Sequence, residues 1–517
     1  TVREAAADHA ADRKSAIDGY TRRQRYSAKA CWISYPCKRS QMPSINKANL
    51  QATIQYAIQQ HKAGQVELAS AIYVSILDSF PDHFEALYLL AMVAQHADDH
   101  GRAIQLLGKA DQSRPGQRSV HLQLGISFNQ LGEREKAVSS YQKALSIDGA
   151  CVEAYCNLGN LFNRMGNVQG ALENFAHALR LGPSIAQIPY NLGVLYQERM
   201  QPDKAVEWFR KAISLKTDYA AAHNHLGVAL SEIGDSEEAI GHYRKAQELD
   251  PNSADAFYNL HALLLDSAEM PEAVRCMEKA VMLEPSNNVY RLSKGVLHDY
   301  MGDREKAAAC LAATDGSESM IADLEAWIYI KSLGDPLPTM LGSAARTFRL
   351  AIDGAQLQGL VLEFGVYQGK SIRQIAALVS GAVHGFDSFE GIPEAWCDEE
   401  KGSYSTGGIL PKVPANVHLH AGWFEDTVPA FIRDEAGPIR FINVDCDLYS
   451  STRTILDLLC KQIVPGTVIV FDECIGYPGW KEHEFRAFKE AAENYGWRHE
   501  ILAFSFVTKQ VVFRITN

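Results

Sequence analysis

The 517-residue sequence contains few cysteines, no Cys-x-x-Cys pair and no long apolar run. Ten scattered cysteines argue against a disulfide framework or a zinc-finger array and are typical of reduced thiols. No segment approaches the roughly 20 apolar residues that cross a bilayer. Positive charge is not in excess either, because the net charge is −12, which argues against nucleic acid or an anionic membrane as a partner. We therefore expect a cytoplasmic protein.

The first residues differ in charge from the rest of the chain. Residues 1–41 carry nine Lys or Arg against four Asp or Glu and show no sustained apolar period. Met42 directly precedes the first regular pattern. We expect residues 1–46 to be a disordered basic tail, or sequence that is not part of the natural protein. The alternative is a basic arm that binds an acidic partner.

An alanine recurs every 34 residues through the first half of the chain. Small residues at a fixed interval mark places where two helices cross closely, and glycines and helix-breaking residues follow the same interval. The pattern resembles the tetratricopeptide repeat, a helix–turn–helix unit. The resemblance implies an α superhelix of eight repeats over residues 47–321. The alanines in register are Ala69, Ala103, Ala137, Ala171, Ala205, Ala239, Ala273 and Ala307.

A polar residue stands two positions before most of the repeat glycines. Carboxamide side chains offer paired donors and acceptors that match an extended peptide backbone. The series resembles the asparagine ladder in the repeat superhelix of O-linked N-acetylglucosamine transferase, and it predicts a groove that binds a protein or peptide. The alternative is that these side chains bond only to neighbouring helices or to water. The residues are Gln123, Asn157, Asn191, His225 and Asn259.

Beyond a helical connector at residues 322–345, short apolar runs alternate with helical stretches over residues 346–517. This alternation predicts an α/β fold with a doubly wound, mostly parallel sheet of seven strands that ends in an antiparallel hairpin. That arrangement resembles the class I S-adenosylmethionine (SAM) methyltransferase fold. We expect strands near 359–364, 382–387, 416–420, 439–445, 466–472, 498–505 and 508–515, and helices near 370–380, 424–434, 450–462 and 482–495.

The first strand runs into a turn with two glycines four residues apart, Gly365 and Gly369. Glycine lets the backbone turn tightly at the carboxyl edge of the sheet, where open α/β sheets bind ligands. The G-x-G-x-x-G pattern of a dinucleotide fold is absent, which argues against an NAD-dependent enzyme. The second strand ends at Asp387-Ser388, and an acid at this point can accept both hydroxyls of a ribose.

Three more acids follow later strands. Asp445 ends one strand, and Asp472 and Glu473 end the next. Adjacent parallel strands place their carboxyl ends side by side, so these side chains should converge. Carboxylates held together repel one another unless a cation neutralises them, and Mg²⁺ prefers oxygen ligands. We expect a magnesium site that binds vicinal hydroxyls of the substrate, with helix capping and surface charge as the alternative.

Three motifs together resemble the macrocin O-methyltransferase family over residues 355–515. They are G-F-D-S-F-E-G-I-P, D-x-D-L-Y-x-S-T and the Asp472-Glu473 pair. The resemblance implies SAM and Mg²⁺ as cofactors and a sugar hydroxyl as the methyl acceptor. By position, SAM would be lined by Glu363, Gly365, Tyr367, Gly369, Asp387 and Ser388, and the metal would be held by Asp445, Asp472 and Glu473. Glu473 departs from the family, which more often has a second Asp there.

Two further features lie near the expected site. Trp423 and Phe424 follow the third strand, where an aromatic ring can flank adenine, with plain packing as the alternative. His483 begins the helix after the fifth strand and is a candidate general base beside Asp445, or a solvated helix-start histidine.

Taken together, these patterns predict a SAM-dependent O-methyltransferase that acts on a sugar hydroxyl of a glycan or glycosylated metabolite, with a repeat array for a protein or peptide. The alternative is an interaction scaffold whose methyltransferase domain is inactive.

Overall fold

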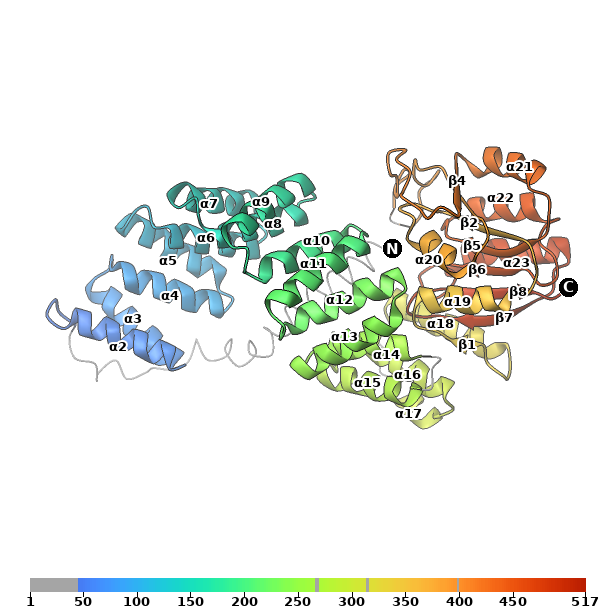
Figure 1. Cartoon of the computed structure of the whole chain (residues 1–517). Coiled ribbons are helices and arrows are strands. Elements are labelled where there is room, and N and C mark those ends of the chain that lie inside the picture. Colours follow the sequence, from blue (N-terminus) through green and yellow to red (C-terminus); the bar gives the residue numbers. More distant parts are fainter. Residues whose placement is uncertain (1–44, 266–268, 313–315, 398) are drawn as a thin grey trace. The chain divides into compact units, whose positions relative to one another are not determined.

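The computed structural model describes residues 45–517 apart from 266–268, 313–315 and 398. Most of the predicted basic tail therefore lies outside the described residues. The chain divides into two compact units, at Leu192 and Gly193. This division falls inside the repeats, so the second unit contains both repeat helices and the α/β sheet (Figure 1).

Consecutive helices of similar length fill the first unit. Each repeat contributes two helices of about 13 or 14 residues, which pack against each other before the next pair begins. The helices are α2 (Leu50–Lys62), α3 (Val66–Ser79), α4 (Phe84–His96), α5 (His100–Ser113), α6 (Arg118–Gln130), α7 (Arg134–Ile147), α8 (Val152–Arg164) and α9 (Val168–Leu181), and α10 (Gln187–Glu198) continues into the second unit.

The second unit begins with the remaining repeat helices. They are α11 (Pro202–Leu215), α12 (Ala220–Ile233), α13 (Ser236–Leu249), α14 (Ala254–Leu264), α15 (Met270–Leu283), α16 (Asn288–Tyr300) and α17 (Arg304–Leu311). The 34-residue period predicted from the sequence thus appears as successive helix pairs. The repeated alanines are fully buried or nearly so, because the two helices of each pair cross at these positions.

Most repeat glycines lie against an aromatic ring from the second helix of the same pair, and Gly295 lies against Leu311 instead. A β-carbon added at Gly159 would lie 2.6 Å from Phe175, and one added at Gly227 would lie 2.6 Å from Tyr243. In both pairs the ring comes 16 positions after the glycine. A side chain at the glycine would displace the ring, so the absence of a β-carbon is what lets the two helices pack so closely.

Eight strands form one sheet in the order β1-β7-β8-β6-β5-β2-β3-β4. The strands β2 to β7 run parallel, and β8 lies antiparallel between β6 and β7. The predicted mostly parallel sheet with a terminal hairpin is confirmed, but it has eight strands and not the predicted seven, because β1 pairs with β7 at one edge. The strands are β1 (Thr339–Met340), β2 (Leu360–Phe364), β3 (Val383–Asp387), β4 (Val417–Ala421), β5 (Ile439–Val444), β6 (Val468–Phe471), β7 (His499–Phe504) and β8 (Val511–Ile515).

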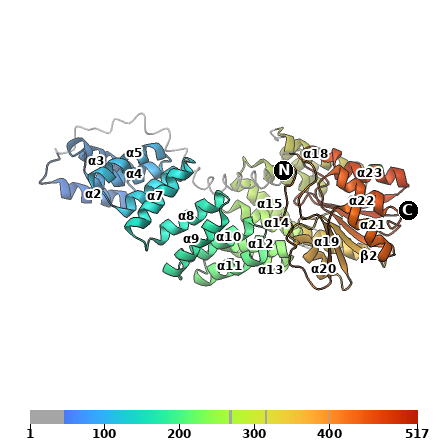
Figure 2. The same cartoon turned by 90° about the horizontal axis from the view of Figure 1, so that it is seen from above.

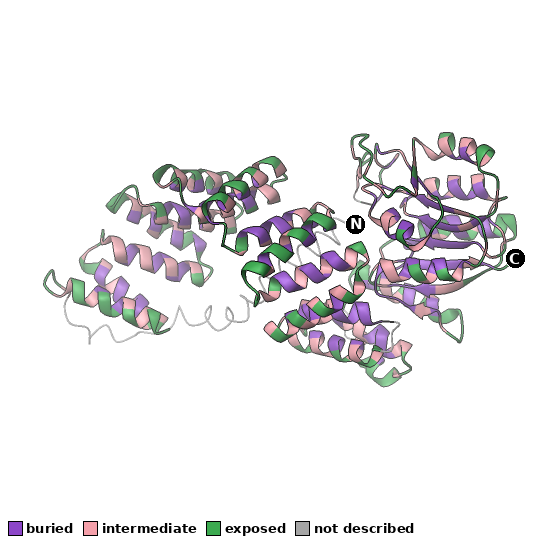
Figure 3. Ribbon diagram, in the orientation of Figure 1, coloured by how far each residue is buried: buried purple, intermediate pink, exposed green. Residues whose placement is uncertain are grey.

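Helices pack on both faces of this sheet (Figures 1 and 2). Phe348 of α19 (Ala344–Gly354) and Ile372 of α20 (Lys370–Leu378) share one apolar core with Val361 and Phe441 of the sheet. Phe488 of the last helix packs against the sheet residue Phe471, with the two rings tilted at 56°. Because the strands are covered on both faces, nearly all their residues in β2, β5 and β6 are buried, as Figure 3 shows. The remaining helices are α21 (Phe424–Asp434), α22 (Tyr449–Leu459), the short 3-10 helix η2 (Trp480–Glu482) and α23 (Glu484–Tyr495).

The connector contains more structure than the sequence predicted. It begins as helix α18 (Glu318–Ser332), but the strand β1 and the start of α19 follow before the sheet proper. The strand β1 has only two residues and extends the sheet beside β7. A strand of this length has no periodicity of its own, so only its pairing partner reveals it.

The glycine–ring contact can be tested with two Gly→Ala substitutions on neighbouring helices. We expect Gly227→Ala to lower the free energy of unfolding by about 1–3 kcal/mol, because the new methyl overlaps the Tyr243 ring. Gly241→Ala on α13 should raise it by up to about 1 kcal/mol, since no atom lies within 4 Å of the added carbon. Urea unfolding followed by circular dichroism measures both, and equal effects would contradict the contact.

Candidate functional site

The turn after β2 approaches the backbone of the neighbouring strand more closely than any side chain would allow. Gly365 has φ 90°, and a β-carbon there would lie 1.6 Å from the carbonyl oxygen of Asp445. Tyr367 also has a positive φ, of 48°, and Gly369, with φ 76°, precedes the first residue of α20. The two predicted glycines therefore shape a tight loop at the carboxyl edge of the sheet.

Asp387 at the end of β3 organises this loop. One carboxylate oxygen accepts the backbone N–H of Tyr367 at 2.7 Å, and the other accepts the N–H of Phe389 at 2.6 Å. Burial raises the pKa of Asp387, although these N–H donors act in the opposite direction. Each oxygen can accept a second hydrogen bond, so the predicted contact with a ribose is compatible with this arrangement. Ser388 follows with its hydroxyl donating to the carbonyl of Gly391.

Glu363 lies within β2, beneath the turn, and is fully buried. One of its oxygens accepts the hydroxyl of Ser371, while Oε2 is buried and has no hydrogen-bond partner among the described residues. Burial raises the pKa of Glu363 to about 8, and the charges of Asp472 and Asp387 act in the same direction. A buried oxygen without a partner, directly under a glycine turn, fits a residue that lines a polar ligand.

The later acids meet at the same edge, as the sequence predicted. Val444 of β5 pairs with Phe471 of β6, so Asp445 and Asp472 follow paired positions. Burial raises the pKa of Asp445 well above its usual range, and the charges of Asp472 and Asp447 add to this. Glu473 has its pKa raised to about 7, first by burial and then by Asp472. The side chains thus form a repelling carboxylate cluster.

The cluster does not assemble the predicted magnesium site. Within the described part of the chain, no three His, Cys, Asp or Glu side chains are arranged to hold a metal ion. One oxygen of Asp472 is instead occupied by the amide of Gln510. Asp445, Asp472 and Glu473 therefore do not fit a preformed metal site, and we derive no step through Mg²⁺.

Asp447 belongs to the cluster but was not singled out from the sequence. Burial raises its pKa well above the usual range, and Glu473 and Asp472 raise it further. Its backbone has φ 62°, a left-handed conformation that non-glycine residues seldom adopt. The second Asp of Asp445-Cys446-Asp447 (the D-C-D motif) was a visible signal, because side chains two positions apart lie on the same face of an extended strand.

Glu484 holds the loop that carries these acids. It is the first residue of α23, is fully buried, and accepts the backbone N–H groups of Cys446 and Asp447 at 3.3 and 3.2 Å. The charge of Asp447 and burial raise the pKa of Glu484, with burial the larger cause. The start of α23 is thereby tied to the D-C-D loop.

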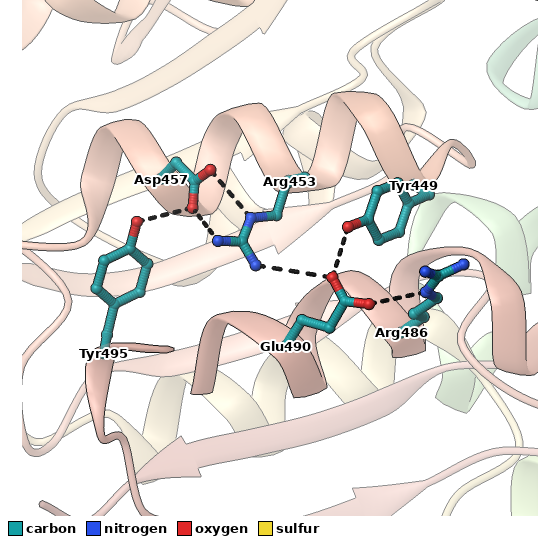
Figure 4. Close-up of polar contacts among 6 residues, drawn as sticks. All are labelled: Tyr449, Arg453, Asp457, Arg486, Glu490 and Tyr495. Carbon is teal, nitrogen blue, oxygen red and sulfur yellow. Dashed lines mark hydrogen bonds and ion pairs between the residues drawn. The ribbon is translucent and has the colours of Figure 1, made fainter. Parts of the chain in front are cut away.

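A network of polar side chains also joins α22 to α23 (Figure 4). Glu490 of α23 accepts the hydroxyl of Tyr449 at 2.5 Å and the Nε–H of Arg486 at 2.8 Å. Tyr449 is the first residue of α22 and follows the D-C-D loop two residues later in the chain. The network therefore fixes where α22 begins relative to α23. Its members are Tyr449, Arg453, Asp457, Arg486, Glu490 and Tyr495.

Three aromatic side chains beside the cluster were missed by the sequence reasoning. Trp396, Tyr404 and Tyr477 surround one small apolar core with Ile392 and Leu448. The indole N–H and both hydroxyls are buried, and none has a hydrogen-bond partner among the described residues. The two tyrosines have raised pKa values, mainly from burial, with Asp447 and Glu473 contributing. Buried donors that have no partner among the described residues, next to buried carboxylates, can bind a ligand that carries hydroxyl groups.

His483 lies at the edge of this aromatic group. Its ring is 6.2 Å from the rings of both Trp396 and Tyr477, and burial lowers its pKa. A neutral imidazole can accept a proton, so the position is compatible with the predicted general base. Phe424 packs edge-on against Phe364, with ring centroids 5.4 Å apart, so its ring serves the core. Trp423 is the N-cap residue of α21, and its contact with adenine stays a prediction.

The ladder residues already use some of their hydrogen-bonding capacity inside the repeats. The side chain of Asn191 accepts from Gln187 at 2.8 Å in the first unit. In the second unit, Asn259 donates to Asn224 at 3.1 Å, and the His225 ring is 2.9 Å from Gln197. Gln123 and Asn157 are half-buried. These contacts leave the peptide-binding role a prediction.

Family comparisons match both halves of the chain. Residues 362–474 match a family described as a methyltransferase domain. Residues 61–118, 125–166, 152–184 and 184–252 match tetratricopeptide-repeat families. The chain therefore contains tetratricopeptide repeats followed by a C-terminal methyltransferase domain. The glycine turn and the carboxylate cluster both lie within the matched methyltransferase residues or directly beside them.

Individual relatives resemble only parts of the chain. A curated relative from Streptomyces olivaceus is 8-demethyl-8-(2,3-dimethoxy-alpha-L-rhamnosyl)-tetracenomycin-C 4'-O-methyltransferase. It is 28% identical in an alignment 170 residues long that covers 28% of this chain and 60% of the relative. The solved structure of YrrB, a TPR protein with an unusual peptide-binding site, has 26% identity and a TM-score of 0.30, over 36% of this chain and 97% of that one. A tetratricopeptide-repeat protein from Parabacteroides merdae has 17% identity and a TM-score of 0.40, over 47% and 96%. In the parts of the chain that the structure describes, no helix is both long and apolar enough to cross a membrane.

The burial of Glu363 makes stability depend on pH. Its pKa is raised from 4.5 to about 8, so between these values the folded protein binds a proton that the unfolded chain releases. The free energy of unfolding should therefore fall as the pH rises through this window. Glu363→Gln cannot ionise, so its unfolding free energy should fall less, as measured by urea unfolding at pH values of about 5.5 and 8. The matched substitution Glu425→Gln, at an exposed position, should keep the wild-type slope, and an unaltered slope in Glu363→Gln would refute the assignment.

Proposed function

We propose that the C-terminal domain is a SAM-dependent O-methyltransferase that acts on a sugar hydroxyl of a glycan or glycosylated metabolite. The carrying observation is the turn built on Gly365, whose loop is bonded to Asp387 and faces the acids after β5 and β6. This places a tight polar loop and a set of proton acceptors at one sheet edge. The tetracenomycin-type relative, which methylates a rhamnosyl group by its name, supports the substrate class.

The residues present fit SAM as the methyl donor. When bound, SAM supplies an electrophilic methyl group on a sulfonium. Gly365 and Gly369 give the backbone of the turn, and Glu363 offers a buried oxygen that has no partner among the described residues. Asp387 holds the loop and keeps acceptor capacity on both oxygens for ribose hydroxyls. The glycine spacing favours a ligand without a pyrophosphate.

The acceptor hydroxyl would lie between the aromatic group and the carboxylate cluster. Flat rings such as Trp396 and Tyr477 suit the apolar face of a sugar. Their N–H and O–H groups, which have no partner among the described residues, suit its hydroxyls. Asp445 has a raised pKa and is therefore a stronger base than an ordinary carboxylate, able to accept the hydroxyl proton as the methyl group is transferred. Positioning of donor and acceptor would supply much of the rate.

The repeats would bind a protein or peptide. The carboxamides of the ladder lie on successive first helices. Gln123, Asn157 and Asn259 are half-buried, whereas Asn191 is buried, and an amide keeps further donors or acceptors after one internal contact. Magnesium stays an implication of the family resemblance, and cytoplasmic location stays an expectation from composition.

Binding of the methyl donor is testable by isothermal titration with SAM. We expect wild-type protein to bind, and Asp387→Ala to raise Kd by about tenfold or more, because the substitution removes the ribose acceptor and the two hydrogen bonds that shape the loop. Asp434→Ala, at an exposed position on the same domain, should bind like wild type. If wild-type protein does not bind SAM, the scaffold alternative is favoured.

The choice of general base is testable with labelled SAM and an extract that contains acceptors. Asp445→Asn should reduce methyl transfer by about 100-fold or more, because the amide cannot accept the hydroxyl proton, while Kd for SAM stays within about threefold of wild type. His483→Asn should retain most transfer. The opposite pattern would assign the base to His483, and transfer that depends on neither residue would contradict the site.

A further inference from the structure

A repeat helix ends directly against the helix that follows the glycine turn. Glu232 lies in the last turn of α12, and Lys370 is the first residue of α20. Oε1 of Glu232 is 3.3 Å from Nζ of Lys370. The buried amide of Gln374, one turn further along α20, donates a hydrogen bond to the backbone carbonyl of Glu232. Side chain and backbone of one repeat residue thus both contact α20.

Two further close contacts join the repeat helices to the α/β part. A β-carbon at Gly342, just before α19, would lie 2.0 Å from the carbonyl oxygen of Ala262 on α14. Arg346 of α19 donates to the carbonyl of Leu265, which caps α14, at 2.7 Å. On the repeat side both contacts are made by backbone carbonyls of α14 and its C-cap, which hold α14 close to α19. The Glu232–Lys370 pair adds an ion pair between α12 and α20.

The other side of α20 belongs to the proposed cofactor site. Gly369 caps the helix, and Ser371 donates its hydroxyl to the buried Glu363. The ammonium of Lys370 also lowers the pKa of Asp472 in the carboxylate cluster, against the larger effect of burial. The first turn of α20 therefore touches Glu232 on one side and the residues of the site on the other.

We propose that Glu232 is a positioning residue for the methyl-donor site, so that the repeat array forms part of the enzyme's cofactor-binding structure. This inference rests on the proposed function. Helix α20 has only nine residues, too few to be stable without tertiary contacts. The carboxylate of Glu232 lies at its N-terminal end, where a negative charge favours the helix dipole, and it keeps Lys370 on the repeat side. Without that charge, Lys370 can turn toward Asp472 and alter the glycine turn that precedes it.

The test measures SAM affinity of the full chain by titration calorimetry. Glu232→Gln keeps the size of the side chain and removes its charge, and we expect Kd for SAM to rise by about threefold to tenfold. Glu237→Gln is the matched control, because Glu237 is exposed on the next helix, away from α20. Lys370→Glu should also weaken binding, and Glu232→Lys combined with Lys370→Glu should recover most of the affinity lost in either single variant.

Hydrogen exchange separates positioning from a general loss of stability. Backbone amides of residues 366–374 should exchange faster in Glu232→Gln than in wild type, while those of the β5 and β6 strands should not change. Unaltered Kd and unaltered exchange in Glu232→Gln would overturn the proposal, and so would faster exchange spread over the whole domain. If wild-type protein fails to bind SAM, the proposed function is wrong, whereas the exchange measurement still decides whether Glu232 holds α20.

Discussion

Repulsion among acidic side chains at one sheet edge is the constraint on which the C-terminal half depends. Burial and mutual charge raise the pKa values of Glu363, Asp445, Asp447 and Glu473. A buried carboxylate lowers the stability of the fold unless hydrogen bonds from the surrounding chain compensate for the water that it has lost. Backbone N–H groups and the amide of Gln510 donate hydrogen bonds to acids of this region. The hydrogen bond from Tyr449 of α22 to Glu490 of α23 helps to hold the loop that carries Asp445 and Asp447. A site with this much unneutralised acceptor capacity suits ligands that bring donors or positive charge.

Close backbone approach is what permits this arrangement, and it recurs in both halves. In the repeats, glycine faces an aromatic ring from its partner helix, as Gly227 faces Tyr243. At the site, Gly365 lies against the backbone of Asp445. In each case the missing β-carbon lets two elements pack at a distance that any other residue would prevent. The repeats bury a core between successive helices, whereas the sheet buries one on each face, and α12 and α14 join the two kinds of packing.

Much of the fold was accessible from local patterns. The 34-residue alanine period reflects the need for a small residue where two helices cross, and the strand–helix alternation reflects the periodicity of apolar residues. Both patterns could therefore be predicted by counting residues. The glycine turn and Asp387 were also predictable, because both follow strands at positions where open sheets bind ligands. The strand β1, the helix α19 and the role of Asp447 could not be predicted in this way. A two-residue strand and an acid with a left-handed backbone conformation leave no periodic pattern in the sequence. Trp396 and Tyr404 belong to one loop, whereas Tyr477 comes from a segment far away in the sequence, and nothing in these segments shows that they meet.

The sequence by itself determined the fold class of each half of the chain, the alternation of strands and helices, and the presence of acids at the strand ends. These features depend on periodicity and on residue type. Only the tertiary structure decided which acids face one another and that the predicted magnesium triad is not assembled in the described residues. It also decided which buried donors among those residues lack partners and which repeat helix contacts the glycine-turn helix. These outcomes depend on side-chain direction and on distances between segments more than 100 residues apart, as between Glu232 and Lys370, and such distances are set only when the whole chain packs.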